Sequence, residues 1–306
     1  MTKIKVIGIG GSGCNAVTRM AKCKIKNVEL IALNTDAQDL SRTRADIKLR
    51  IGQQLTQGLG AGMDPEIGRK SALENRAEIL KLLPGADLIF ITYGLGGGTG
   101  SGAGPVVASL AKELGILTIA VVTKPFSFEG RARLKIAENG IRNLRKNVDT
   151  LIVITNDKLL SILNPAVSLI DAFWFCDDIL RQAVQGISDL ILLPGIVNVN
   201  FADIKAIMSG AGSAFFGLGR ATGENRATQA ALAAIKSPLL NVSLKGAKGI
   251  LFNVAGGKDI SLSEINEVAQ VITAQANPEA KIIFGAIQKE KIKPGEIKVS
   301  VIATGF

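Results

Sequence analysis

The residues best suited to chemistry in this sequence are glycines, which are concentrated in two short segments. One segment, GLGGGTGSGAGP, covers residues 94–105, and the other, VIGIGGSGCNAV, covers residues 6–17. Glycine lets the backbone approach a ligand closely and lets consecutive N–H groups converge on an anion, while Thr99 and Ser101 add hydroxyl donors. Both segments are therefore expected to bind phosphate groups. The alternative is that they are only tight turns that allow helices to pack.

Neither glycine segment identifies the ligand by itself. The first contains Gly8-x-Gly10-x-x-Gly13, a dinucleotide fingerprint, and Asp36 follows the next predicted strand, so an NAD-dependent oxidoreductase is one alternative. The second lacks the Gly-Lys-Ser/Thr of a P-loop. The chain has no histidine, which excludes histidine bases and histidine metal sites. Chemistry must therefore use carboxylates, amides, hydroxyls, backbone groups or a bound metal ion.

The composition indicates a globular protein with a large core. Of 306 residues, 47% are hydrophobic and 20% are charged. Apolar runs are too short to span a bilayer, and the N-terminal segment shows no signal-peptide pattern. Three widely spaced cysteines predict neither a disulfide framework nor a metal site, and they fit a reducing cytoplasm.

The net charge of +10 indicates either a solvated basic surface or an acidic partner such as a nucleotide, a nucleic acid or an anionic lipid. The lysines are scattered along the chain. With one Trp and one Tyr there is little scope for stacking on bases, so nucleic-acid binding is not expected.

The glycine segments must be positioned by the strands and helices around them. Continuous apolar runs predict strands at 3–9, 28–33, 47–51, 86–93, 116–122 and 150–155. Helical patterns lie at 13–22, 65–82, 105–114, 130–146 and 157–162. This alternation predicts an α/β fold with a parallel sheet covered on both faces, in which a ligand binds beyond the carboxyl ends of the strands.

The second half of the chain follows a different pattern. A long helix is predicted from 167 to 193, bracketed by Pro165 and Pro194 and placed between two domains because it is apolar on more than one side. Further helices are predicted at 201–209, 225–236 and 261–276, and strands at 248–255, 281–287 and 297–303. This part is expected to form a smaller α+β domain.

The loop GLGGGTGSG resembles the GGGTG(S/T)G signature of the tubulin/FtsZ superfamily. The blocks GIGGSGCNAV, ALNTDAQDL, GLGAGMDPEIG, VVTKPFSFEGRAR, VDTLIVITNDKLL, VQGISDLI and NFADIKAIMSGAG extend the resemblance to the bacterial FtsZ family over essentially the whole chain. The resemblance implies a Rossmann-like GTPase domain at 1–166, a connecting helix at 167–194 and a C-terminal α+β domain at 195–306. It also implies a cytoplasmic protein that polymerises head to tail with itself into filaments at the division site.

The resemblance assigns a GTP or GDP site to particular residues. The implied nucleotide ligands are Gly11, Ser12, Gly13, Cys14, Asn15, Gly97, Gly98, Thr99, Gly100, Ser101, Gly102, Glu129, Arg133, Asn156, Phe173 and Asp177. Phe173 would stack on guanine, and Asp177 would accept from its ring N–H and amino groups. Mg²⁺ is expected through phosphates and water, with no protein ligands of its own. Alternatively, Glu129 and Arg133 form an exposed helix pair, Phe173 is core and Asp177 is a solvated charge.

The catalytic groups implied by the resemblance lie in the segment NVNFADIK. The family hydrolyses GTP between subunits, and two acidic residues from the next subunit orient the attacking water, usually in N-x-D-F-A-D. Here Asp203 holds the second acidic position, but Asn200 holds the first. An amide accepts a proton poorly, so slow hydrolysis is expected, or an assembling scaffold with little turnover.

The sequence also departs from the family elsewhere. No disordered linker and C-terminal peptide follow Phe306, so recruitment of membrane-anchor proteins is less firmly expected. Thr155 stands where proline is usual, and Trp174 and Phe175 stand where small or polar residues are usual. The family is typically acidic, which leaves the basic charge unexplained.

Overall fold

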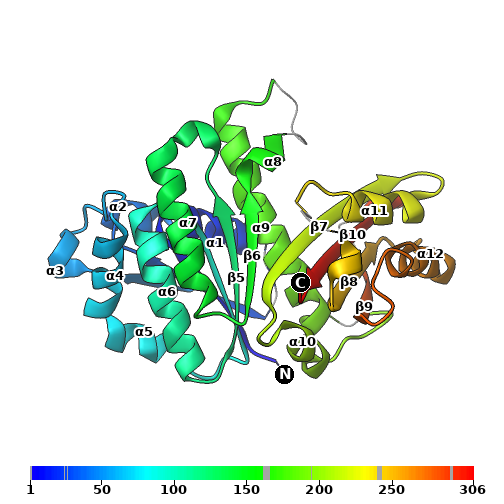
Figure 1. Ribbon diagram of the computed structural model, residues 1–306, viewed down its shortest axis with the longest axis horizontal. Coiled ribbons are helices and arrows are strands. Elements are labelled where there is room, and N and C mark those ends of the chain that lie inside the picture. The colour runs from blue at the N-terminus through cyan, green and yellow to red at the C-terminus, as the bar shows by residue number, and fades with distance from the viewer. Residues whose placement is uncertain are drawn as a thin grey trace. The chain divides into compact units, whose positions relative to one another are not determined.

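The apolar runs in the first half of the chain form six parallel strands (Figure 1). Their order is β3-β2-β1-β4-β5-β6. They are β1 (Ile4–Ile9), β2 (Val28–Asn34), β3 (Ile47–Arg50), β4 (Leu88–Gly94), β5 (Leu117–Lys124) and β6 (Thr150–Thr155).

These strands belong to the first of two compact units, which extends to Gln185, while the second runs from Gly186 to Phe306. The structure is a computed structural model. It describes residues 2–23, 25, 27–160, 166–193, 195–239, 243–289 and 292–306.

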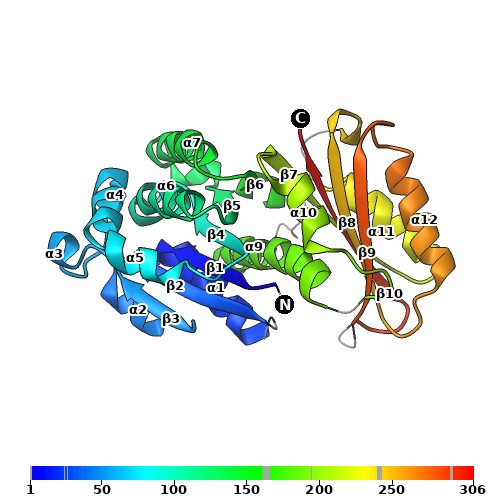
Figure 2. The same ribbon diagram turned by 90° about the horizontal axis from the view of Figure 1, so that it is seen from below.

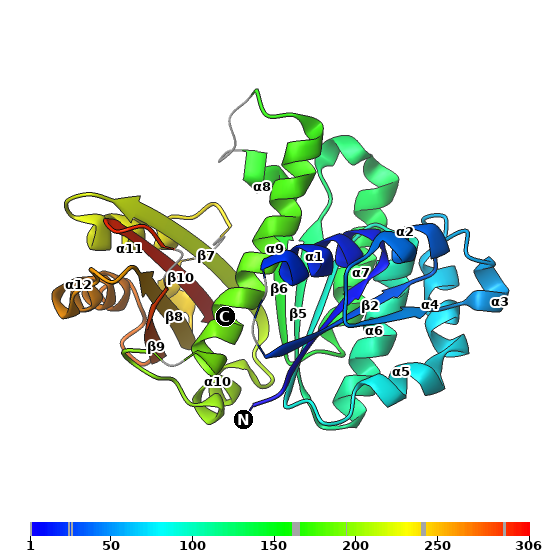
Figure 3. The same ribbon diagram turned by 180° about the vertical axis from the view of Figure 1, so that it is seen from behind.

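Helices cover both faces of the parallel strands. Figure 2 shows α4, α6 and α7 on one face, and Figure 3 shows α1 and α2 on the other. The helices are α1 (Gly10–Cys23), α2 (Ala37–Arg42), α3 (Gln53–Thr56), α4 (Pro65–Glu74), α5 (Arg76–Leu82), α6 (Gly98–Glu113), η1 (Ser127–Glu129), α7 (Arg131–Arg145) and α8 (Asn156–Leu160). Burial from both sides explains the continuous apolar runs, because β4 is buried from Leu88 to Tyr93. The expected α/β fold is confirmed.

Several helix boundaries differ from the prediction for physical reasons. The single helix expected at 65–82 is two helices, broken at Asn75, whose side-chain oxygen accepts the N–H of Gly52 at 2.8 Å. Helix α6 begins at Gly98 instead of residue 105, so most of its glycine segment is helical. The short helices α2 and α3 were not predicted. The end of the helix expected at 157–162 lies outside the described residues.

The predicted long helix is present as α9 (Leu169–Leu192). The division between the units falls within it, after Gln185. Pro165 and Pro194, which were expected to bracket it, lie outside the described residues.

The second unit is built on four strands in the order β7-β10-β8-β9. Strand β10 is antiparallel to β7 and β8, and β9 is parallel to β8. The elements are α10 (Phe201–Met208), β7 (Gly212–Thr222), α11 (Arg226–Ile235), η2 (Leu244–Gly246), β8 (Gly249–Gly256), α12 (Leu262–Thr273), β9 (Lys281–Gln288) and β10 (Glu296–Thr304). The α+β prediction is confirmed.

Strand β7 was missed because its sequence, GSAFFGLGRAT, is rich in glycine. The structure shows why one glycine is needed there. A Cβ on Gly219 would lie 1.9 Å from the carbonyl oxygen of Ala230, so α11 packs directly on the strand backbone. Alanines of α11 and apolar residues of β8, β10 and α12 form the core on this side. Among the described residues, no helix is long and apolar enough to cross a membrane.

Candidate functional site

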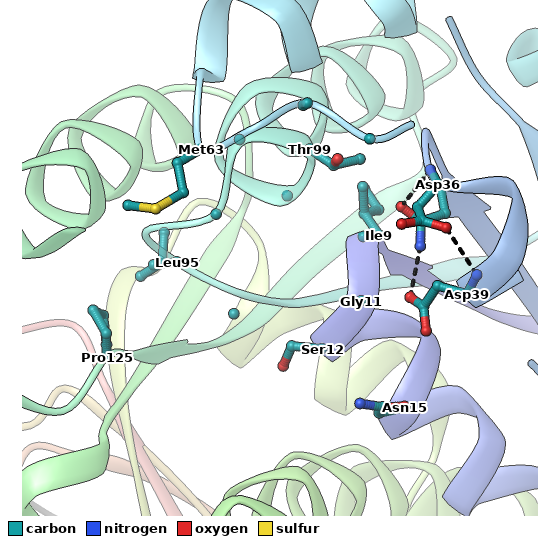
Figure 4. A pocket seen from close by; sticks show the side chains of 18 of the residues that line it. Ile9, Gly11, Ser12, Asn15, Asp36, Asp39, Met63, Leu95, Thr99 and Pro125 are labelled. Atoms are coloured by element: carbon teal, nitrogen blue, oxygen red, sulfur yellow. Dashed lines mark hydrogen bonds between the residues drawn. The ribbon is translucent and has the colours of Figure 1, made fainter. Parts of the chain in front are cut away.

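A pocket of about 700 Å³ lies at the carboxyl ends of the parallel strands, within the first unit. Its lining includes the last residues of β1, β2 and β4 and the residue that follows β6, namely Ile9, Asn34, Gly94 and Asn156. Figure 4 shows Ser12 and Asn15 of α1, Asp39 of α2 and Thr99 of α6 around this space. The pocket therefore lies where an open parallel sheet places its ligand.

Most of the predicted nucleotide ligands line this pocket. They are Gly11, Ser12, Asn15, Gly97, Gly98, Thr99, Gly100, Glu129, Arg133, Asn156, Phe173 and Asp177. Four predicted ligands do not line it, namely Gly13, Cys14, Ser101 and Gly102. The structure gives each of these four a contact within the fold.

Gly13 and Cys14 lie on the side of α1 that faces the sheet. A Cβ on Gly13 would lie 2.6 Å from the carbonyl oxygen of Thr92, so glycine allows α1 to approach β4. The Cys14 side chain is fully buried beside Ala32 and Leu40. Burial raises the pKa of its thiol to about 12, so the sulfur remains protonated and unreactive.

The glycines of the second segment allow close helix packing as well as close approach of a ligand to the backbone. Only Gly96 has a positive φ, of 92°, whereas the glycines from 98 onward are helical. A Cβ on Gly100 would lie 2.8 Å from the Tyr93 ring, and one on Gly102 would lie 2.0 Å from the carbonyl oxygen of Pro65. Helix α6 therefore lies directly against β4 and α4. The glycines from residue 98 onward therefore permit close helix packing and do not provide a left-handed backbone.

The hydroxyls of the segment fix its shape. Ser101 Oγ accepts the N–H of Gly96 at 3.0 Å, which holds the turn before α6. Thr99 Oγ1 lies 2.7 Å from Thr35 Oγ1, which connects α6 to the end of β2. The first turn of α6 thus presents its N–H groups to the pocket from a fixed position, as anion binding requires.

Asp177 on α9 is buried at the edge of the pocket, with 7% of its surface exposed. Arg19 Nη2 lies 3.3 Å from one carboxylate oxygen, and Ser12 Oγ lies 3.4 Å from the other. Burial nevertheless raises the pKa of Asp177 to about 6, with Arg19 and Ser12 acting in the opposite direction. The ionised carboxylate is therefore short of donors, and a ligand that offered two N–H groups would stabilise it.

The Arg19 guanidinium is itself held by an aromatic ring. Its carbon atom lies 4.9 Å from the centre of the Trp174 ring, on the preceding part of α9. Half of the Trp174 surface is exposed, so this cation–π contact lies at the protein surface. Trp174 thus helps to hold Arg19 in place, and Arg19 in turn contacts the Asp177 carboxylate.

The other side of the pocket combines an ion pair, an amide and a ring. Arg133 Nη1 donates to Glu129 Oε2 at 2.6 Å, and the second Glu129 oxygen accepts the N–H of Phe126 at 2.8 Å. Asn156 is buried, and its side-chain oxygen has no partner among the described residues. Phe173 is 38% exposed and contacts Phe126 edge-on, with ring centres 5.4 Å apart, so one face remains open to a ligand.

Sequence reasoning missed a cluster at the end of β2. Asn34 Nδ2 donates to Asp39 at 2.8 Å, and Asp36 accepts the N–H of Asp39 at 2.9 Å as the N-cap of α2 (Figure 4). All three line the pocket, as does the loop at 59–63. The sequence signal for these residues was their position at or just after the end of a predicted strand. For Asp36, that position suggested dinucleotide binding. No group of three or more Cys, Asp or Glu residues in the described chain could hold a metal ion.

Asn200 and Asp203 belong to the second unit, at the start of α10. Asn200 is the N-cap residue, yet its exposed side chain forms no capping hydrogen bond, although asparagine commonly does so there. Its carbonyl oxygen accepts the N–H of Asp203 at 3.0 Å. The amide of Asn200 is thus not used by its own helix.

Comparison with protein families assigns both units. Residues 3–164 match the tubulin/FtsZ family, GTPase domain, and residues 212–306 match the FtsZ family, C-terminal domain.

Solved structures agree with these matches. An empty FtsZ dimer from M. jannaschii is 44% identical with a TM-score of 0.96, covering 100% of this chain and 88% of that one. The W319Y mutant of FtsZ from the same organism is 45% identical with a TM-score of 0.96, covering 99% and 91%. The GTPγS-bound CetZ2 protofilament from Haloferax volcanii shares the fold, at 19% identity and a TM-score of 0.84 over 99% and 92%. The chain therefore belongs to the FtsZ family of tubulin-like GTPases.

Proposed function

We propose that this chain binds GTP in the pocket of its first unit and polymerises head to tail, with hydrolysis completed by α10 of the next copy. The observation that carries the proposal is the buried, donor-poor carboxylate of Asp177 in a pocket that is also lined by the first turns of α1 and α6. GDP is the product that remains after hydrolysis.

Asp177 is proposed to select guanine. Its carboxylate can accept the ring N–H and the exocyclic amino group together, whereas adenine has no such donor pair. Phe173 offers a half-exposed ring for stacking, and the unpartnered oxygen of Asn156 can accept a hydroxyl or amino proton. Glu129 suits a sugar hydroxyl and Arg133 a phosphate oxygen.

The phosphates are proposed to lie between the first turns of α1 and α6. Both helices begin with glycine at the pocket, so their unpaired N–H groups and positive dipole ends face the same space. Mg²⁺ would supply charge neutralisation for the departing phosphate. The oxygen atoms of Thr99, Asp36 and Asp39 in the lining would contact the water ligands of such a cation, so the cation would need no protein ligand of its own.

Asn200 and Asp203 are proposed to face the nucleotide of the adjacent copy. Asp203 would orient and polarise the attacking water, and Asn200 would position it without accepting its proton. The unused side chain of Asn200 and the M. jannaschii dimer support this assignment. Hydrolysis is then slow, and a scaffold that assembles on GTP and turns over little is the limiting case.

A direct test compares GTP, GDP and NAD in a thermal shift assay and then images the GTP and GDP samples by electron microscopy. GTP and GDP should raise the Tm, NAD should not, and filaments should form with GTP. A shift with NAD alone would contradict the proposal and restore the oxidoreductase alternative.

Replacing Asn200 with aspartate tests the reason given for slow hydrolysis. Restoring a carboxylate at this position should raise phosphate release by at least about ten-fold, because positioned acid–base and electrostatic groups contribute two or more orders of magnitude. GTP affinity should not change, since the residue lies outside the pocket of its own subunit.

Asn277→Asp is the matched control for this substitution. It adds the same charge to the second unit, and its side-chain oxygen can still accept the N–H of Glu279. Equal rates in Asn200→Asp and Asn277→Asp would refute the role assigned to Asn200.

A further inference from the structure

One face of α7 carries a stripe of cations that the proposed function does not use. The exposed residues are Arg131, Lys135, Arg142, Arg145 and Lys146, which we call the α7 stripe. Their spacing places them on the face opposite the buried residues of this helix, over about 22 Å of its length. Lys112 of α6 joins the stripe at its far end, where its Nζ donates to the carbonyl oxygen of Lys146 at 3.3 Å.

The α7 stripe lacks the carboxylate partners that several other arginines of the first unit have. Arg69 pairs with Glu66, and Arg76 pairs with Glu113. The one carboxylate of α7, Glu138, pairs with Lys124 of β5 at 3.3 Å. Within the described residues, no ion pair joins any member of the stripe to a carboxylate.

The helix dipole favours Arg142 and Arg145, which lie in the last turn of α7, but it does not explain the rest of the stripe. Arg131 lies at the N-terminus, where the helix dipole disfavours a positive charge, and the first turn holds no acidic residue. Arg131 with Lys135, and Arg142 with Lys146, are like charges four residues apart, which repel on one helix face. An external polyanion would relieve both penalties at once.

We propose that the α7 stripe binds the surface of an anionic lipid membrane. Lipid headgroups diffuse laterally, so a phosphate can settle beneath every cation of a straight row. The phosphates of a duplex follow a helical path. A straight row of cations would contact them only where the row crosses the phosphate backbone. Single-stranded nucleic acid would need stacking partners, and the sequence of α7, RARLKIAENGIRNLR, contains no aromatic residue.

The contact is peripheral and depends on assembly. The stripe offers no apolar side chain for insertion, so attraction is limited to charges within a Debye length of the surface. Each cation there contributes about five-fold to binding, so one subunit binds weakly, and a polymer that repeats the stripe binds far more tightly. The tighter binding of the polymer rests on the proposed polymerisation. The affinity of a single α7 stripe for the membrane does not.

Flotation with vesicles tests the inference. The full chain is mixed with vesicles of 30% phosphatidylglycerol in phosphatidylcholine, or of phosphatidylcholine alone, with GTP or GDP. One variant carries R131Q, K135Q, R142Q, R145Q and K146Q. The control carries K22Q, K81Q, K236Q, K245Q and K258Q at exposed lysines elsewhere, so each variant lowers the net charge from +10 to +5.

The wild type and the control should float with the anionic vesicles in GTP, and the stripe variant should lose at least ten-fold in the floated fraction. Equal losses in both variants, or no flotation of polymerised wild type, would overturn the proposal. Binding to a 30-base-pair DNA duplex but not to vesicles would overturn it in favour of nucleic acid. Light scattering in the same samples reports polymerisation, so failure to assemble is recognised separately, and GDP samples at low salt still report the stripe's affinity.

Discussion

Asp177 is the buried carboxylate to which we assign the selection of guanine. Its pKa is raised from 3.8 to about 6, so holding the carboxylate ionised at neutral pH in the empty pocket costs about 3 kcal/mol. Stability from this group is therefore fully present below pH 3.8 and is lost as pH rises through about 6. On the proposed assignment, a base that donates two hydrogen bonds would recover that energy, and guanine would be favoured over adenine.

The pH dependence of GTP binding should follow this carboxylate. Affinity should be nearly constant above pH 7 and fall about ten-fold by pH 5, because only about one site in eleven is then ionised. The empty protein should gain stability from the same group over that range. Calorimetric titration of the wild type and of Asp177→Asn checks this, and an equally steep pH dependence in the variant would contradict it.

Trp174 should act on binding through Arg19. Removing the ring in Trp174→Leu loses a partly exposed cation–π contact, for which we expect a two- to five-fold weaker GTP affinity. The midpoint of the pH dependence should also move upward, because a less ordered Arg19 lowers the Asp177 pKa less. Trp174→Phe retains a ring and serves as the control, and identical behaviour of the two variants would argue against this role.

Among the elements, the glycine-rich start of α6 both lines the pocket and packs closely against its neighbours. Its first residues line the pocket, and the lack of a Cβ on several of its glycines allows contact with β4 and α4. A Cβ on Gly102 would meet the backbone of both Pro65 and Arg69, which cannot rotate away. Packing alone therefore requires glycine at position 102.

Gly102→Ala should force α4 and α6 apart and lower the Tm of the empty protein by about 2–10 °C, as overpacking does in domains of this size. Gly97→Ala is the comparison, because its φ is −87° and the nearest atom to an added Cβ is 4.0 Å away. That variant should melt like the wild type. Equal melting temperatures in both variants would show that packing does not require Gly102.

The strands of the first unit, and the pocket at their carboxyl ends, were predictable from the sequence. The periodicity and apolarity of side chains along a strand are local properties of the chain. The family resemblance added Asp177 and Phe173, which are distant in sequence from the glycine segments. The packing contacts of Gly13 and Gly102, the break at Asn75 and the strand β7 depend on neighbours far along the chain. Sequence patterns do not show contacts between distant residues, so these features could be seen only in the folded structure.

At the scale of the whole molecule, the proposed function places half of the active site on each of two copies. The pocket belongs to the first unit, and Asn200 and Asp203 belong to the second. A head-to-tail contact uses different surfaces on the two partners, so it extends into an open filament unless its rotation closes a ring. Turnover is then a property of the polymer.

The most direct test of this account is the GTPase rate per subunit measured across a dilution series. Almost no turnover is expected at low concentration, and the rate per subunit is expected to rise above the concentration at which filaments appear. A rate per subunit that stays constant across the series would show a complete active site in each monomer and would contradict the shared site.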